Sequence, residues 1–190
     1  TQWSSSAASD VYKRQDLDLL VGSGGVLSHA PRRQQSARML IDAFMPEGIT
    51  QLAVDSIFMM PQLGVLANID KDELKEDASQ AALEVFDNDC LIRLGTCVTP
   101  VGNAKPNSKM ADVTLTFGDG TVKEIEINEG SLEMMEHPYE EVKVHIKPSR
   151  GIDVGAGKGE ELESVIYGGV VGLIFDGRNR PITLSKESDQ

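Results

Sequence analysis

The chain has 190 residues, of which 40% are hydrophobic and 25% charged, as is usual for a soluble globular protein. Its formal net charge is −12 and it has no basic stripe, which argues against binding to nucleic acid or to an anionic membrane. No apolar run approaches the ~20 residues that a membrane-spanning helix needs. Cys90 and Cys97 lack zinc-site spacing and predict buried free thiols, as in a reducing cytosol, so we expect a cytoplasmic protein.

The first residues, 1–15, are rich in Ser and Ala and contain no apolar core of a signal peptide. We expect this segment to be extraneous or disordered, and a linker from an upstream domain is the alternative. On either interpretation the chain is expected to be a piece of a longer protein. Residues 185–190 are expected to form a polar tail.

Residues 16–31, DLDLLVGSGGVLSHAP, combine a short apolar run with a glycine-rich turn. The run at 17–21 predicts a buried strand, and Gly22, Gly24 and Gly25 predict the turn after it. Glycine has no Cβ, so such a turn bends sharply and lets a ligand approach the backbone closely. A helix after the turn would direct unpaired N–H groups toward phosphate or ribose oxygens.

Helices and strands then alternate. Residues 31–46 predict a helix with one apolar face, formed by Ala37, Leu40, Ile41 and Phe44. A strand is expected at 50–55 and further helices at 58–69 and 70–87. Asp70 and Glu73 have the spacing of a capping box at the start of the last helix. This alternation predicts an α/β region at 16–88.

After residue 87 the pattern changes to short β-branched segments separated by turn residues. Strands are expected at 90–98, 112–117, 121–127, 142–147, 162–167 and 170–176. Gly118-Asp119-Gly120 is typical of a tight hairpin turn. We therefore expect a small all-β barrel or sandwich domain at 89–184, which makes the fold class of the chain α+β.

The glycine turn does not fit the two commonest phosphate-binding motifs. A dinucleotide fingerprint needs a third glycine or alanine after Gly22-x-Gly24, and Leu27 stands there instead. A Walker loop needs Gly-Lys-Ser/Thr, which Ser28-His29-Ala30 does not supply. The strand followed by G-S-G-G and a helix resembles the adenosine motif of the actin, Hsp70 and sugar-kinase ATPase superfamily.

Further segments extend this resemblance. GSGGVLSHAP is followed in order by residues 48–69, 146–159 and 168–182. Together they resemble the C-terminal half of the glutamate mutase (methylaspartate mutase) accessory protein L family, which is unrelated to the mismatch-repair protein of the same short name. The resemblance covers residues 16–184. It implies an actin-like ATPase fold, with ATP or ADP and Mg²⁺ as cofactors and an adenosylcobalamin-dependent mutase as the partner.

The same resemblance makes Gly22, Ser23, Gly24 and Gly25 the expected nucleotide contacts. It places the phosphate hairpins and the Mg²⁺ ligands upstream of residue 16, so we expect no catalytic residue and no metal ligand on this chain. A plain strand-to-helix turn is the structural alternative. His29, Arg32 and Arg33 follow the turn, and solvent-exposed positions suit them better than a role at the nucleotide.

Other candidate groups have simpler interpretations. Asp55 ends a strand, where it would meet a ribose or Mg²⁺ or would cap the next helix. Met59 and Met60, with Leu63 and Leu66, are expected in the core and not in a partner groove. The loop at 153–159, D-V-G-A-G-K-G, lacks a Ser or Thr after Lys158 and is expected to be an ordinary loop with its lysine in solvent. His137 and His145 suggest no metal site.

The function expected from the sequence is that of an ATP-binding accessory or reactivating protein of a glutamate-mutase-type enzyme. This chain would carry the adenosine side of the nucleotide cleft and would not hydrolyse ATP by itself. A dinucleotide-binding oxidoreductase fragment and a non-catalytic interaction module are the alternatives. The sequence leaves the oligomeric state and the identity of the mutase open.

Overall fold

The computed structural model describes residues 17–68 and 75–182. Seven strands form one sheet in the order β1-β2-β3-β9-β7-β5-β6, and β4 pairs with β8 as a second, two-stranded sheet. The strands of the large sheet are β1 Leu19–Gly22, β2 Gly48–Asp55, β3 Leu91–Thr99, β5 Lys109–Phe117, β6 Val122–Asn128, β7 Leu132–Pro148 and β9 Leu162–Asp176. The short strands are β4 Val101–Gly102 and β8 Ile152–Asp153. The helices are α1 Gly25–Ser28, α2 Arg33–Phe44, α3 Met60–Ala67 and α4 Lys75–Val85, and a π-helical turn, Phe86–Cys90, follows α4.

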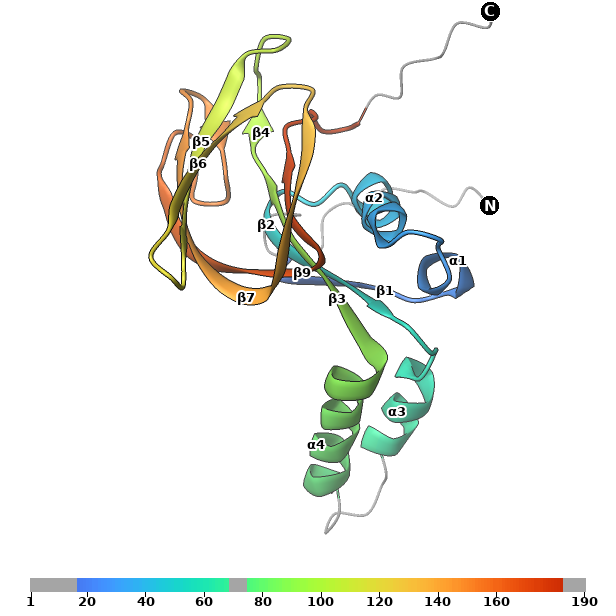
Figure 1. The fold of residues 1–190 in the computed structure, drawn as a ribbon. Coiled ribbons are helices and arrows are strands. Elements are labelled where there is room, and N and C mark those ends of the chain that lie inside the picture. Colours follow the sequence, from blue (N-terminus) through green and yellow to red (C-terminus); the bar gives the residue numbers. More distant parts are fainter. Residues whose placement is uncertain (1–16, 69–74, 183–190) are drawn as a thin grey trace, which may run out of the picture.

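The fold is a mixture of α and β structure, as expected. For residues 89–184 the sequence predicted a barrel or a sandwich, and a closed barrel is wrong. β1 and β6 are the two edges of the large sheet, so the sheet stays open (Figure 1). It runs through both regions predicted from the sequence, because β2 pairs antiparallel with β3 across residue 88. The strand-rich half curls around an apolar core, which includes Val113, Leu115, Val144 and Ile166.

Two long strands make this curl. β7 and β9 pair antiparallel over most of their length, from Leu132 with Asp176 to Ile146 with Leu162. β3 pairs parallel with the second half of β9, and the two backbones approach very closely where Gly95 lies opposite Gly172. A Cβ on Gly95 would lie 1.7 Å from the Gly172 carbonyl oxygen, and Gly95 has a φ of +138°. Only glycine fits this close backbone contact, which joins the two halves of the sheet.

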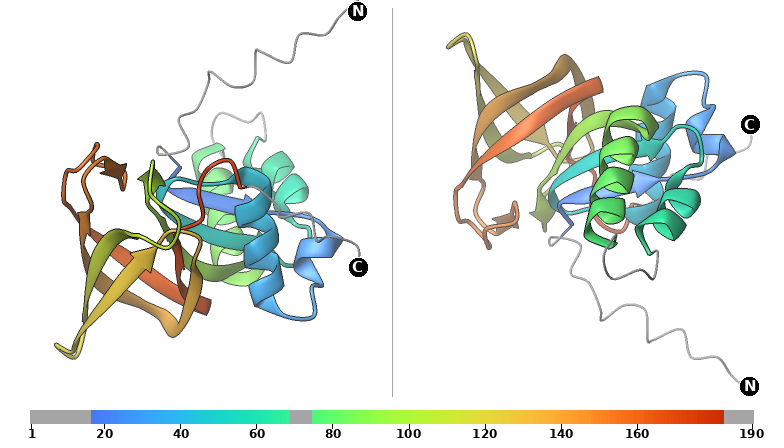
Figure 2. Two further views of the ribbon diagram at one scale, coloured as in Figure 1. Left: turned by 90° about the horizontal axis from the view of Figure 1, so that it is seen from above. Right: turned by 90° about the horizontal axis from the view of Figure 1, so that it is seen from below.

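Helix α2 covers one face of the β1–β2–β3 part of the sheet (Figure 2). Ala37, Leu40 and Ile41 are buried against Leu20 and Leu52, as the helical spacing predicts. Phe44, placed on the same face by the sequence, is instead 53% exposed. The helix ends at that residue, because Met45 takes the left-handed conformation with φ of 48° and Pro46 follows.

Charged side chains connect the end of β9 to α2, and among them Asp176 and Arg180 are buried. Asp176 is fully buried, and its carboxylate accepts hydrogen bonds from Arg178 Nε at 2.9 Å and from Arg180 Nη2 at 2.9 Å. Arg178 also pairs with Asp42 on α2 at 2.9 Å, and Arg180 donates to the Pro46 carbonyl at 3.3 Å. These contacts link the segment after β9 to α2 and to the residues that follow α2.

Helices α3 and α4 lie side by side and project away from the sheet (Figure 1). Among the residues that the structure describes, their common core contains three buried residues, Leu63, Ala82 and Cys90, with Met59, Ala67 and Phe86 partly buried around them. The expected core role holds for Leu63 and in part for Met59, whereas Met60 and Leu66 are each 38% exposed. The predicted capping box at Asp70 and Glu73 lies outside the described residues.

Candidate functional site

The glycine turn lies where two parallel strands end. β1 pairs parallel with β2, and Gly22 is opposite Val54, so Asp55 and the turn meet at the carboxyl edge of the sheet. The turn leads directly into α1, where Leu27 and Ser28 donate backbone hydrogen bonds to the Gly24 carbonyl at 3.0 and 2.9 Å. In open α/β sheets, ligands bind in the crevice outside the carboxyl ends of the strands. The sequence therefore placed its candidate site at the edge of the sheet that suits a ligand.

The three glycines of the turn, Gly22, Gly24 and Gly25, differ in burial and in backbone conformation. Gly22 is buried, and a Cβ there would lie 2.7 Å from both Leu27 Cδ1 and Leu40 Cδ2. Gly24 has φ of 126° and ψ of 148°, a conformation available essentially to glycine alone, yet its Cβ position is open. A Cβ on Gly25 would also meet nothing within 4 Å, and Gly25 is exposed. Gly22 thus serves packing, whereas Gly24 and Gly25 present bare backbone to open space.

Asp55 organises this edge of the sheet. The residue is fully buried. Its Oδ1 accepts a hydrogen bond from Met59 N at 3.3 Å, and its Oδ2 accepts one from Met60 N at 3.1 Å. The Ser23 hydroxyl donates a longer bond of 3.4 Å to Oδ2. Of the two roles proposed from the sequence, the structure supports the capping of the next helix, because both carboxylate oxygens face the start of α3.

Ser28 holds the turn against β2. Its hydroxyl lies 2.8 Å from the Asp55 carbonyl oxygen and 3.0 Å from the Gly24 carbonyl oxygen, and the residue is buried. This role of Ser28 was not predicted from the sequence. The available signal was a small hydroxyl residue in the first helical turn after the glycines, because such side chains readily bond to nearby backbone.

The residues after the turn have structural partners or face solvent. His29 is exposed, and its Nδ1 lies 3.2 Å from the Gly25 carbonyl oxygen. Arg33 donates from Nη1 to the Ser28 carbonyl at 2.8 Å and so supports the end of α1. Arg32 is exposed, as the sequence predicted.

In the second glycine-rich loop, residues 153–159, a side chain of the loop itself binds the backbone N–H groups. The Asp153 carboxylate accepts hydrogen bonds from Gly155 N at 2.8 Å and from Gly157 N at 3.0 Å. These N–H groups are the ones that a phosphate would need. Lys158 is exposed, as the sequence predicted.

Both cysteines are buried and free, as predicted. Burial raises the pKa of the Cys97 thiol to about 12, and the charge of Asp176 adds to the rise. Burial also raises the pKa of the Cys90 thiol, with a further contribution from the charge of Asp55. Because the thiolate is the reactive form, neither residue is suited to nucleophilic chemistry.

In residues 17–68 and 75–182, no group of three or more His, Cys, Asp or Glu side chains is arranged to hold a metal ion. His145 instead pairs with Glu161 at 2.7 Å, and the His137 ring packs beside Phe117 with centroids 5.0 Å apart. None of the helices within the same ranges is both long and apolar enough to cross a membrane.

One comparison with known proteins bears on this site. Residues 5–84 match the model of the MutL protein family. Over this range, which includes the glycine turn, Asp55 and α3, the match confirms the resemblance to the glutamate mutase accessory family. The match covers less than half of the chain and begins within the segment at 1–15. No curated protein and no solved structure matches the chain.

Proposed function

We propose that this chain is part of a nucleotide-binding accessory protein of a glutamate-mutase-type enzyme, and that it carries the adenosine side of the nucleotide site. The observation that carries the proposal is the open backbone of Gly24 and Gly25 at the carboxyl ends of β1 and β2, within the segment that matches the MutL family. The wider resemblance to the actin-like ATPases supplies the expected ligand, ATP or ADP.

The turn has the chemistry that a nucleoside needs. The absence of Cβ atoms at Gly24 and Gly25 lets a planar base or a ribose lie directly against the backbone. Ser23 is exposed, and its long 3.4 Å bond to Asp55 can be exchanged for a bond to a ribose or phosphate oxygen. We assign ligand contact to Ser23, Gly24 and Gly25, and support of the turn to Gly22.

Asp55 is a poor candidate for holding Mg²⁺, because the residue is fully buried and its oxygens face Met59 and Met60 N–H groups. On this proposal, Mg²⁺ and the phosphates are held by a second lobe, as in the actin-like ATPases. The 190-residue chain by itself is then expected to bind nucleotide without turning it over, and robust ATP hydrolysis by the purified chain would contradict the assignment.

Titration calorimetry with ADP, ATP and NAD tests the site. We expect ADP and ATP to bind the chain, or a version extended upstream in its gene, and Gly24→Val to remove that binding. Gly120→Ala is the matched control, because Gly120 also has a positive φ, of +83°, and open space but lies in the distant β5–β6 turn. Binding of NAD alone would indicate an oxidoreductase fragment. Binding of no nucleotide would leave a non-catalytic interaction module.

The partner in this proposal is an adenosylcobalamin-dependent mutase. Nucleotide-driven closure of two lobes would be coupled to that enzyme and would release damaged cobalamin. The test is recovery of activity by a cobalamin-inactivated glutamate mutase after addition of the accessory protein and ATP. Recovery that does not depend on ATP would contradict the coupling.

A further inference from the structure

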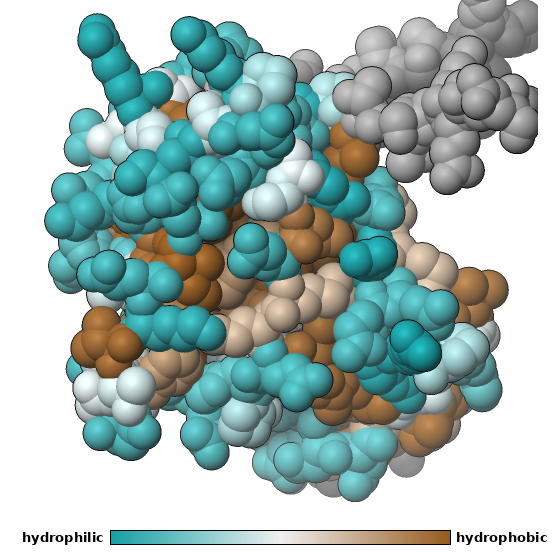
Figure 3. All heavy atoms as spheres, turned by 45° about the horizontal axis from the view of Figure 1, so that its top comes forward, coloured by the Kyte–Doolittle hydropathy of each residue, from teal (hydrophilic) through white to brown (hydrophobic). Residues whose placement is uncertain are grey.

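The projecting pair of helices α3 and α4 leaves apolar surface uncovered. Side chains on both helices stay exposed at large fractions, 75% for Val65, 60% for Leu83 and 38% for Leu66. The small shared core explains why, since two short helices packed on each other cannot bury all sides of both. Elsewhere, the face of the molecule in Figure 3 is covered mostly by hydrophilic residues, with separate hydrophobic patches between them.

A groove runs between the two helices. Its volume is about 270 Å³, and its walls come from Met60, Leu63, Gly64 and Ala67 on α3 and from Ser79, Ala82, Leu83 and Phe86 on the opposite side. Gly64 contributes no side chain, and a Cβ there would meet nothing within 4 Å. The volume is below the roughly 300–1,000 Å³ of small-molecule sites, so the groove fits the insertion of a few apolar side chains better than an enclosed ligand.

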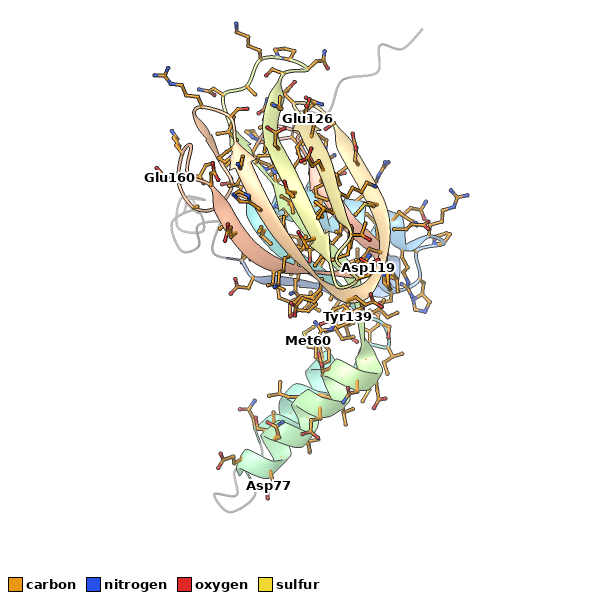
Figure 4. The ribbon with its side chains drawn as sticks, turned by 60° about the vertical axis from the view of Figure 1, so that its left-hand side comes forward. Met60, Asp77, Asp119, Glu126, Tyr139 and Glu160 are labelled. Atoms are coloured by element: carbon orange, nitrogen blue, oxygen red, sulfur yellow. The ribbon has the colours of Figure 1, made fainter. Side chains whose placement is uncertain are left out.

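Acidic residues lie on α4, which forms one side of this groove. α3 contains no charged residue, and the charged side chains described on α4 and the following turn are Glu76, Asp77, Glu84, Asp87 and Asp89. Helical spacing places Glu76 seven residues before the exposed Leu83, on the same stripe of α4. Asp87, in the π-helical turn after α4, forms an ion pair with Arg93. Figure 4 shows Asp77 at the far end of the helix pair and Met60 at the end nearest the sheet.

We propose that the groove binds an amphipathic helix of a partner protein, with its apolar face in the groove and Lys or Arg residues against the acidic residues of α4. Helix-in-groove recognition uses apolar anchors at i, i+3, i+4 and i+7, which suits a groove between two helices. Charge selects against a second copy of this chain, because self-association through this surface would bring two sets of acidic side chains together. The proposal is independent of nucleotide binding.

Fluorescence anisotropy with the whole 190-residue chain tests the proposal. The probe is a labelled helical peptide of about 18 residues, or five turns, made of Leu and Lys with the leucines on one face. The same peptide with Glu in place of Lys is the charge control. We expect the Leu/Lys peptide to bind, with affinity that falls as salt is raised, and the Leu/Glu peptide to bind at least tenfold more weakly.

Two variants locate the binding. Leu83→Gln should weaken binding of the Leu/Lys peptide about tenfold, because it removes an exposed apolar anchor. Val122→Gln is the matched control, since Val122 is 58% exposed and belongs to strand β6 of the sheet and not to the helix pair. Circular dichroism checks that both variants fold.

Equal weakening by Leu83→Gln and Val122→Gln, or none by Leu83→Gln, would overturn the proposal. Equal binding of the two peptides would overturn the role of the acidic residues of α4. A dimer in sedimentation experiments that Leu83→Gln dissociates would show that the groove serves self-association instead.

Discussion

Removal of the Asp55 charge should destabilise α3 selectively. Asp55→Asn keeps the size of the side chain but replaces one carboxylate oxygen by an NH2 group, which is a donor. In the wild-type chain the two oxygens accept from Met59 N at 3.3 Å and from Met60 N at 3.1 Å. In the variant one of these N–H groups faces the amide nitrogen and loses its acceptor. A hydrogen bond to a charged group is worth about 1.5–3 kcal/mol, and the relief of a buried charge offsets part of the loss. We expect the free energy of unfolding of α3 to fall by about 2 kcal/mol.

Hydrogen exchange read by mass spectrometry measures this change where it occurs. A loss of about 2 kcal/mol corresponds to roughly 30-fold faster exchange of the α3 amides, in Met60–Ala67, when they exchange by local opening. The amides of α2 serve as the internal reference, because α2 packs on the sheet through Leu40 and Ile41 and not through Asp55.

Ser23→Ala is the control for the other side of the carboxylate. It removes only the 3.4 Å hydrogen bond from the Ser23 hydroxyl, so we expect an effect below about 1 kcal/mol. Unchanged exchange of the α3 amides in Asp55→Asn would refute the reasoning. Equal destabilisation by Ser23→Ala and Asp55→Asn would also refute it, because it would mean that the turn and not α3 depends on the carboxylate.

Three further predictions concern the sheet and its buried groups. Gly95→Ala should prevent native folding or lower stability by more than about 4 kcal/mol in urea titrations, because its Cβ would overlap the Gly172 carbonyl oxygen. A near-wild-type midpoint would disprove the close contact between the two strands. Asp176→Asn should lower stability by about 3–5 kcal/mol in the same assay, because it leaves a buried arginine without its charged partner, and a loss below about 1 kcal/mol would contradict that role. The native Cys97 thiol keeps its proton up to about pH 12, whereas the unfolded thiol loses it near 9.0, so this thiol should lower stability as the pH rises above 9, by about 1.4 kcal/mol at pH 10. Cys97→Ala should show a smaller fall between pH 8 and pH 10, and an equal fall would assign the effect to other groups.

The elements with a clear period and clear ends were predictable from the sequence. β1, β2 and α2 were expected within a few residues of their observed bounds, because Gly or Pro marks at least one end of each apolar run or apolar helical face. The long strands were not. Gly168 and Gly169 look like a turn between two short strands, yet β9 passes straight through them. These glycines are explained by backbone that lies far away in sequence, such as the Pro138 carbonyl oxygen 1.9 Å from a Cβ on Gly168.

The candidate site was also predictable only where it depends on local sequence. The glycine turn was visible because its shape depends on consecutive residues. The role of Asp55 was left open, because a carboxylate at a strand end has the same local sequence whether it meets a ligand or caps a helix. Three donors from two different segments decide between these roles. The groove was missed because the apolar residues of α3 were expected in the core, and burial depends on how much surface two short helices have to share.

Asp55 also limits how strongly the two proposed sites can influence each other. Its carboxylate contacts Ser23 in the glycine turn and the backbone of Met60, whose side chain lines the α3–α4 groove. A nucleotide that takes over the Ser23 hydroxyl removes only the 3.4 Å bond and leaves both bonds to α3 in place. The coupling free energy through this route is then below about 1 kcal/mol, or about fivefold in affinity, and it acts equally in both directions. Anisotropy titrations of the Leu/Lys peptide with and without saturating ADP measure it. A change in peptide affinity well above fivefold would mean that nucleotide binding moves β2 or α3 itself. Ser23→Ala removes the hydrogen bond between the turn and the Asp55 carboxylate, so in that case the effect of ADP on peptide affinity would persist in this variant.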